Sequence, residues 1–177
     1  MKSNKIKNFA TSAILIGLAT VLSFIPLPLQ LPFGGKITLF SMLIISLPAY
    51  LYGVKLGFIS SIAFAFLMMI IDPYFVHPVQ ILLDYIVAFG CFGTVAFFRK
   101  KKDGLIIGYI LACICRFIAH CISGYIFFKE FAPENMNAVL YTIVYNGSFV
   151  FTECIFSLVL LFLEPIRKFI DKYKIDN

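Results

Sequence analysis

Residues 77–89, HPVQILLDYIVAF, place an acid, Asp84, directly before Tyr85 in an otherwise apolar run. If this run crosses a lipid bilayer, the carboxylate must be paired, neutralised or functional. Two later apolar runs carry further polar groups, among them His120 and Asn146. A carboxylate, an imidazole and a carboxamide in apolar surroundings could together bind a small cationic molecule by charge and directional hydrogen bonds.

The composition identifies the environment of these groups. The chain has 177 residues, of which 61% are hydrophobic and 14% are charged, with a mean hydropathy of +0.96. Soluble domains are nearer half apolar and a quarter charged. The chain is therefore predicted to be an integral membrane protein with one domain, 1–177, that lies in the lipid bilayer and binds no nucleic acid.

Turn and charge signals divide the apolar residues into six predicted spans. The fold class is all-α, a bundle of six transmembrane helices. The loop PLPLQLPFGG, between the first two spans, contains prolines and glycines that forbid a continuous helix. The predicted helices are 8–25, 37–53, 55–72, 78–98, 104–127 and 138–164.

Basic residues predict the orientation. Of the 15 lysines and arginines, 12 fall before the first span, in the even-numbered loops or after the last span. Basic loops stay in the cytoplasm, so both termini are predicted to be cytoplasmic.

With this topology, six polar side chains lie at similar depth. At a rise of about 1.5 Å per residue, Asp84 lies about 9 Å below the outer surface and Asn146 about 10–12 Å below it. Polar side chains that face lipid are costly, so the group should point into the bundle. It comprises Asp84, Tyr85, His120, Tyr141, Tyr145 and Asn146.

Aromatic residues are abundant at the same level, including Phe33, Tyr74 and Phe128. A buried carboxylate among aromatic rings suits a flat, aromatic organic cation, which gains charge balance and cation–π attraction. The alternative is that these polar groups only join helices to one another. The deeper Arg116 and Glu153 are predicted to form a structural ion pair.

The first helix carries a stripe of small residues, Ala10, Ala13 and Gly17. Small stripes allow close helix approach, so this face could dock a partner membrane protein or pack internally. Gly35-Lys36 fits a nucleotide-binding loop poorly, and neither a metal-ligand spacing nor a nucleophile–base pair stands out. The chain is predicted not to be an enzyme and to carry no cofactor.

The segments HPVQILLDYIVAF, CRFIAHCISGYIFFKEFAP and YTIVYNGSF resemble the thiamine-specific S component (ThiT) family of energy-coupling factor (ECF) transporters. GLATVLSF and GGKIT fit the same family, so the resemblance covers essentially the whole chain. It implies a six-helix bacterial plasma-membrane protein that binds thiamine on its outer side. Its partners would be a transmembrane coupling protein and two ATPases, which alone bind ATP.

The resemblance also implies roles for individual residues. Asp84 would face the thiazolium, beside Tyr85. Asn146 would hydrogen-bond the aminopyrimidine, and His120 matches the fifth-helix histidine of the family. Tyr74, Tyr141 and Phe128 match aromatic pocket positions.

Two departures from the family pattern concern stacking and the acid. The chain has no tryptophan, so Phe33 and Phe128 would have to replace stacking tryptophans, and phenylalanine binds cations less strongly. The acid is Asp84 where some members have glutamate. The first loop is predicted to form a lid that carries Phe33.

The function predicted from the sequence is therefore substrate binding for high-affinity thiamine uptake. Two alternatives stay open. One is an S component for another vitamin such as riboflavin, which lacks a fixed positive charge. The other is a stand-alone, proton-coupled thiamine transporter in which Asp84 and His120 relay protons.

Overall fold

The computed structural model describes residues 2–29, 31, 36–74 and 76–175, and within them the fold is helical without a strand. An isolated antiparallel bridge joins Pro26 and Thr38. The main elements are α1 (Lys2–Ser23), α2 (Ser41–Tyr52), α3 (Val54–Ile71), a composite helix from Pro78 to Phe98, α6 (Gly104–Phe127), η4 (Lys129–Phe131), α7 (Ala138–Phe162) and α8 (Glu164–Asp171).

Five helices in the described part of the chain are long and apolar enough to cross a membrane. A sixth apolar helix, α2, has only 12 residues and is about 18 Å long. The hydrocarbon core of a bilayer is about 30 Å thick, so α2 alone does not span it. The all-α membrane fold is confirmed, and six full spans remain a prediction.

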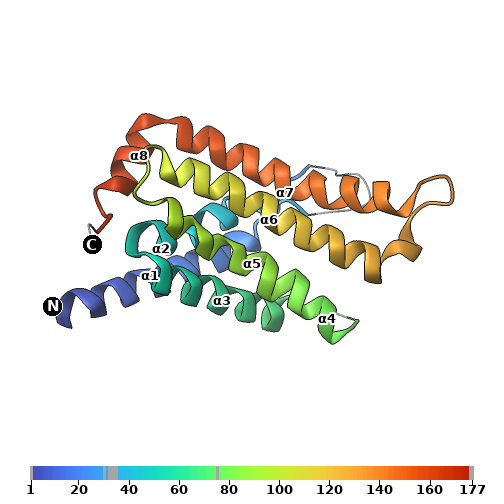
Figure 1. The fold of residues 1–177 in the computed structure, drawn as a ribbon, viewed down its shortest axis with the longest axis horizontal. Coiled ribbons are helices and arrows are strands. Elements are labelled where there is room, and N and C mark those ends of the chain that lie inside the picture. The colour runs from blue at the N-terminus through green and yellow to red at the C-terminus, as the bar shows by residue number, and fades with distance from the viewer. Residues whose placement is uncertain (1, 30, 32–35, 75, 176–177) are drawn as a thin grey trace.

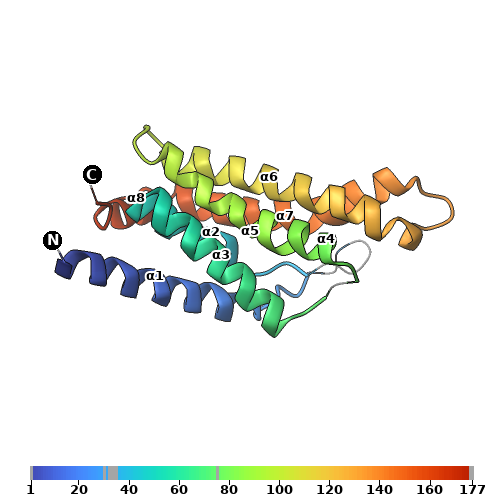
Figure 2. The same cartoon turned by 60° about the horizontal axis from the view of Figure 1, so that its bottom comes forward.

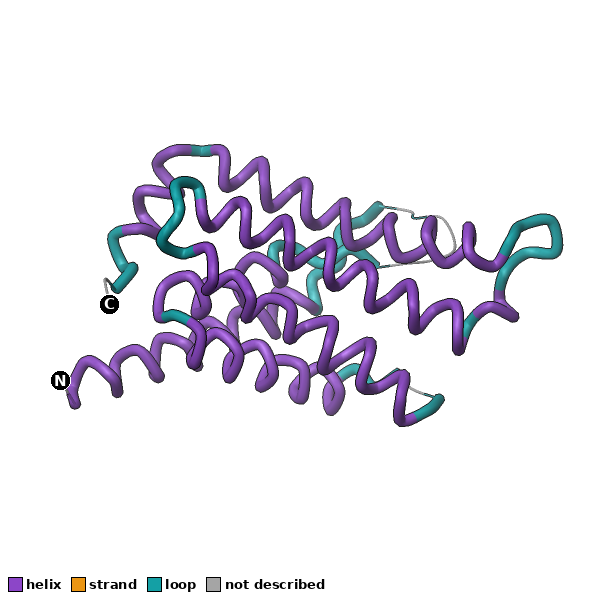
Figure 3. Tube along the Cα trace, in the orientation of Figure 1, coloured by secondary structure: helices purple, strands orange, loops and turns teal. Residues whose placement is uncertain are grey.

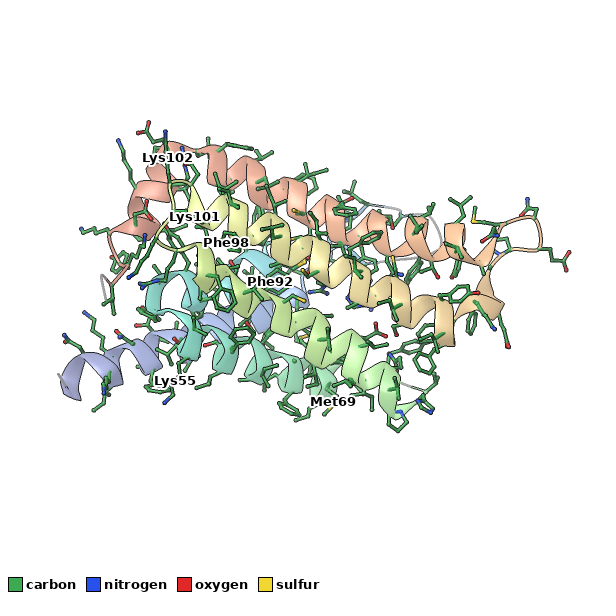
Figure 4. All side chains as sticks on the ribbon, in the orientation of Figure 1. Lys55, Met69, Phe92, Phe98, Lys101 and Lys102 are labelled. Carbon is green, nitrogen blue, oxygen red and sulfur yellow. The ribbon has the colours of Figure 1, made fainter. Side chains whose placement is uncertain are left out.

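The long helices lie side by side along the length of the molecule and alternate in direction (Figures 1 and 2). The N- and C-terminal ends lie at the same end of the bundle in Figure 1. Lys55, Lys101 and Lys102 lie toward that end as well (Figure 4). These three lysines, from two loops that were predicted to be cytoplasmic, are therefore at the same end of the bundle as the termini.

Buried side chains from other segments satisfy both ends of α2. At its N-terminus, the Glu153 carboxylate of α7 accepts hydrogen bonds from the Met42 backbone N–H at 2.9 Å and the Ser41 hydroxyl at 3.0 Å. At its C-terminus, Arg99 donates to the Tyr50 and Leu51 carbonyls at 3.0 and 2.9 Å. A short helix inside a membrane protein needs such partners because its terminal backbone groups find no water.

Two helix boundaries differ from the predicted ones for local reasons. The second helix begins at Ser41 rather than residue 37, because Phe40 adopts a left-handed backbone with φ 60° and the residues before it form the bridge. The last predicted helix ends at Phe162, where the extended Leu163 separates α7 from the short α8.

The fourth helix changes its winding along its length, although it follows one continuous path (Figure 3). It begins as α4 (Pro78–Ile81) and widens into a π-helical segment, η2 (Leu82–Val87). It then continues as α5 (Ala88–Gly90) and tightens into a 3-10 segment, η3 (Cys91–Phe98). π-helical turns occur mostly as single turns within helices, frequently at functional sites. This one contains Asp84 and Tyr85.

Replacement of Arg99 tests the capping of α2. Arg99→Met leaves the Tyr50 carbonyl buried without its donor, which costs about 1–3 kcal/mol. The Leu51 carbonyl also loses Arg99 but keeps the Ile175 N–H at 3.1 Å. We expect a clear fall in the thermal unfolding temperature of the purified protein in detergent. Lys100→Met, at the exposed neighbouring position, is the control and should unfold close to the unchanged protein. Equal unfolding temperatures for the two variants would contradict the capping role.

Candidate functional site

A cavity of about 380 Å³ opens among α3, the composite fourth helix, α6 and α7. Its size lies within the range of small-molecule sites. Its walls combine aromatic rings with two carboxylates, an arginine, a histidine and two amides. The lining residues are Met68, Asp72, Tyr74, Gln80, Asp84, Tyr85, Phe89, Arg116, His120, Gly124, Phe128, Phe131, Tyr141, Thr142, Tyr145, Asn146 and Phe149.

The cavity brings together eight of the nine residues predicted to bind the ligand. The ninth, Phe33, lies outside the described residues, as does part of the first loop that was predicted to be the lid. The eight lining residues are Tyr74, Asp84, Tyr85, His120, Phe128, Tyr141, Tyr145 and Asn146.

Asp84 is the centre of a hydrogen-bond network in the cavity wall. Its Oδ2 accepts from Gln80 Nε2 and from the Ser123 hydroxyl, both at 2.7 Å. Its Oδ1 lies 2.8 Å from Nδ1 of His120. The Asp84 side chain is 16% exposed and that of His120 is 11% exposed. The network joins the fourth helix to α6 and leaves the carboxylate at the cavity surface.

Gln80 and Tyr85, which flank Asp84 in the sequence, hold the segment between α3 and α4. Gln80 Nε2 also donates to the Tyr74 carbonyl at 3.0 Å, and its Oε1 accepts from the Val76 N–H at 3.2 Å. The Tyr85 hydroxyl accepts from the Tyr74 N–H and donates to the Asp72 carbonyl, both at 3.0 Å. The segment that carries Tyr74 is thus fixed by the residues around the acid.

Aromatic rings surround this network. The rings of Tyr74 and Phe128 stack at 5.8 Å with an interplanar angle of 23°. Along α7, the ring centroids of Tyr141 and Tyr145 lie 6.0 Å apart, and those of Tyr145 and Phe149 lie 5.8 Å apart. The spacing of four residues places these three rings on one helix face. The site can therefore offer several ring faces to a flat ligand.

Asn146 is buried where α6 and α7 approach closely. Its Nδ2 donates to the Thr142 carbonyl at 2.9 Å and the His120 carbonyl at 3.3 Å. The approach is favoured by Gly124, because a Cβ there would lie 3.1 Å from Asn146 Nδ2 and would crowd it. With Nδ2 occupied by the backbone, the carboxamide can offer its oxygen as an acceptor to a ligand.

The predicted Arg116–Glu153 ion pair is wrong. No ion pair joins them in the described part of the chain. Glu153 instead caps α2, whereas Arg116 Nε donates to His120 Nε2 at 3.2 Å. The Arg116 guanidinium also lies over the Phe89 ring at 4.3 Å. Equal depth did not imply contact because the two side chains leave their helices toward different partners.

Sequence reasoning missed two lining residues, Gln80 and Phe149, and one hydrogen-bond partner of Asp84, Ser123, whose spacing could have revealed them. Gln80 precedes Asp84 by four residues and Ser123 follows His120 by three, so each shares a helix face with the residue that was recognised. Phe149 continues the four-residue series of Tyr141 and Tyr145.

The stripe Ala10, Ala13 and Gly17 is exposed rather than packed inside the bundle. A Cβ built on Gly17 meets nothing within 4 Å. Ala13 and Gly17 line a shallow apolar groove with residues of α3, including Ala63 and Phe66. The structure therefore contradicts internal packing as the use of this stripe.

These features define the class of protein: a multi-pass membrane protein with a polar, aromatic-lined cavity between its helices. The chain belongs to the thiamine transporter protein family (Thia_YuaJ), whose model matches residues 9–170. It is 33% identical to the thiamine transporter ThiT of Bacillus subtilis (strain 168), over 94% of this chain and 95% of that protein.

A second relative and a solved structure are also similar to the chain. The thiamine transporter ThiT of Lacticaseibacillus paracasei is 26% identical over 48% of this chain and 49% of its own length. The structure of ThiT from Listeria monocytogenes superposes with a TM-score of 0.72 at 24% identity, covering 92% of this chain and 97% of that one. The fold of the two proteins is therefore the same.

Amide hydrogen exchange tests the anchoring of the segment between α3 and α4. Gln80→Leu removes the acceptor of the Val76 N–H, whereas Tyr85→Phe removes the acceptor of the Tyr74 N–H. We expect faster exchange at Val76 in the first variant and at Tyr74 in the second, so that each variant is the control for the other. Unchanged exchange at both amides would show that these side chains do not hold the segment.

Proposed function

We propose that this protein binds thiamine in the cavity around Asp84 and acts as the substrate-binding S component of a thiamine uptake system. Membership of the thiamine transporter family supports thiamine as the substrate. The observation that carries the proposal is a carboxylate at the surface of an aromatic-lined cavity. Thiamine is an aromatic cation with a hydrogen-bonding pyrimidine, and this site offers charge, ring faces and polar groups to match it.

Asp84 would be the counter-ion of the thiazolium. Gln80 and Ser123 place an N–H and an O–H group at its Oδ2, and acceptance of such donors suits an ionised carboxylate. A cation that enters the cavity gains attraction to this charge, and the attraction is stronger away from bulk water. Ring faces such as those of Tyr145 and Phe128 would add cation–π attraction.

Asn146 and the aromatic residues would orient the ligand. The Asn146 carboxamide oxygen would accept from the amino group of the aminopyrimidine. Tyr85, held by its two backbone contacts, and Tyr141 would shape the pocket, while Tyr74 would cover it together with Phe128. His120 would act through Asp84, because its Nδ1 already faces the carboxylate.

Transport would require partners that this chain does not supply. We propose an ECF module of one transmembrane coupling protein and two ATPases, with ATP bound only by the ATPases. The exposed stripe Ala10, Ala13 and Gly17 supports a docking face on α1 for the coupling protein. The basic end of the bundle supports cytoplasmic termini in the plasma membrane, which would leave the Asp84 cavity toward the outside. No catalytic step is proposed.

Equilibrium binding to purified variants tests the counter-ion role. Asp84→Asn should weaken thiamine binding by about 2 kcal/mol or more, because the cation then enters a cavity without its opposite charge. Asp72→Asn, at the other carboxylate that lines the cavity, should stay within about threefold of the unchanged protein because Asp72 is exposed. Unchanged affinity in Asp84→Asn, measured by calorimetry, would remove Asp84 from the site.

Two further measurements separate the alternatives. Unlabelled thiamine should displace bound, labelled thiamine. Riboflavin, which carries no fixed positive charge, should not displace it. Liposomes that contain this chain alone should accumulate no thiamine under a pH gradient, and uptake should require the ATPase module and ATP. Displacement by riboflavin would favour the other vitamin, and gradient-driven uptake would favour the proton-coupled transporter.

A further inference from the structure

His120 uses both ring nitrogens inside the protein. Its Nε2 lies 3.2 Å from Nε of Arg116, one helical turn earlier on α6. Its Nδ1 lies 2.8 Å from Oδ1 of Asp84 on the fourth helix. The three side chains form a continuous row in the cavity wall, from Arg116 and His120 on α6 to Asp84 on the fourth helix.

Hydrogen-bond chemistry assigns the proton on this ring. A guanidinium has only donors, so Nε2 of His120 must be the acceptor of the Arg116 Nε–H. The ring proton is then on Nδ1, where it is donated to Asp84. His120 is accordingly neutral, and its one N–H is already used.

Arg116 is well placed to enforce this state. Its guanidinium lies over the rings of Phe89 at 4.3 Å and Phe92 at 5.9 Å, and its Nη1 is buried without a hydrogen-bond partner. No carboxylate within the described residues forms an ion pair with it. Its positive charge therefore acts on Nε2 of His120 from a fixed position.

The other charged or titratable groups around His120 leave this assignment intact. Asp84 on the fourth helix meets Nδ1. The others line the cavity and are Asp72, Tyr74, Tyr85, Tyr141 and Tyr145. Glu153 on α7 is occupied by the N-terminus of α2. Among the hydrogen bonds of the described residues, Nε2 meets Arg116.

We propose that Arg116 is a positioning residue that fixes His120 as the neutral Nδ1–H tautomer, and thereby leaves the charge of Asp84 available to a cationic ligand. A doubly protonated His120 would form an ion pair with Asp84 and cancel the charge that the ligand needs. The three side chains therefore hold one fixed hydrogen-bonding arrangement and do not relay a proton. The part of the inference that concerns ligand affinity rests on the proposed function, whereas the tautomer does not.

Nitrogen NMR of histidine-labelled protein tests the tautomer directly. The chain has two histidines, and His77→Asn removes the other signal while it keeps a residue that caps α4 well. We expect His120 to show a pyridine-type Nε2 and a pyrrole-type Nδ1 from about pH 5.5 to about pH 7.5, a range in which an ordinary histidine gains a proton. A protonated Nε2 at neutral pH would overturn the proposal.

Two substitutions of Arg116 test its part in this state. Arg116→Met removes both the donor and the charge, so the Nε2 proton should appear as the pH falls through this range. Arg116→Lys keeps a donor and a charge and should retain the pyridine-type signal. Identical spectra for the unchanged protein and Arg116→Met would show that Arg116 does not control the ring. If Arg116→Met fails to fold, the spectra of the unchanged protein and of Arg116→Lys still show whether His120 is the neutral Nδ1–H tautomer.

Thiamine binding provides the functional measurement. The dissociation constant of the unchanged protein should stay constant between about pH 5.5 and about pH 7.5, whereas that of Arg116→Met should rise about tenfold at the acidic end. A flat profile in both proteins would separate Arg116 from ligand binding. If the unchanged protein binds no thiamine, the proposed function fails, and the NMR result still decides the tautomer.

Discussion

The carboxylate of Asp84 lies inside a membrane-spanning helix, and the need to supply it with partners organises the centre of the molecule. Water is scarce at this depth, so the donors must come from the chain itself. Gln80 provides one from the same helix, and Ser123 and His120 provide two from α6. The hydrogen bonds that join the two helices are therefore the same ones that hold the acid at the cavity.

The same constraint accounts for α2, which is too short to span the bilayer and leaves its backbone ends inside the protein. Glu153 receives the N-terminal donors, and Arg99 supplies the C-terminal carbonyls. Arg99 also reaches the Ile175 carbonyl, which ties the C-terminal segment to the bundle. Glu153 and Arg99 are buried and bind the ends of α2. Asp84 differs from them because its carboxylate also borders the cavity.

Hydropathy and charge were enough to predict the long helices, because long apolar runs that alternate with basic loops are typical of membrane-spanning helices. They also predicted the polar set around Asp84, since polar groups at one depth must turn inward. Side-chain pairing was harder: Arg116 and Glu153 share a depth but point to different partners. The π-helical turn at Asp84 leaves no pattern in a single sequence, and Gln80 was missed although it stands four residues before Asp84.

We propose that Asp84 recognises the positive charge of the ligand rather than its shape. The most direct test compares thiamine with its uncharged isostere, in which carbon replaces the charged ring nitrogen, on the unchanged protein and on Asp84→Asn. We expect the unchanged protein to prefer thiamine by at least about tenfold, equivalent to about 1.4 kcal/mol, and Asp84→Asn to lose this preference. An equal preference in both proteins would contradict the proposal.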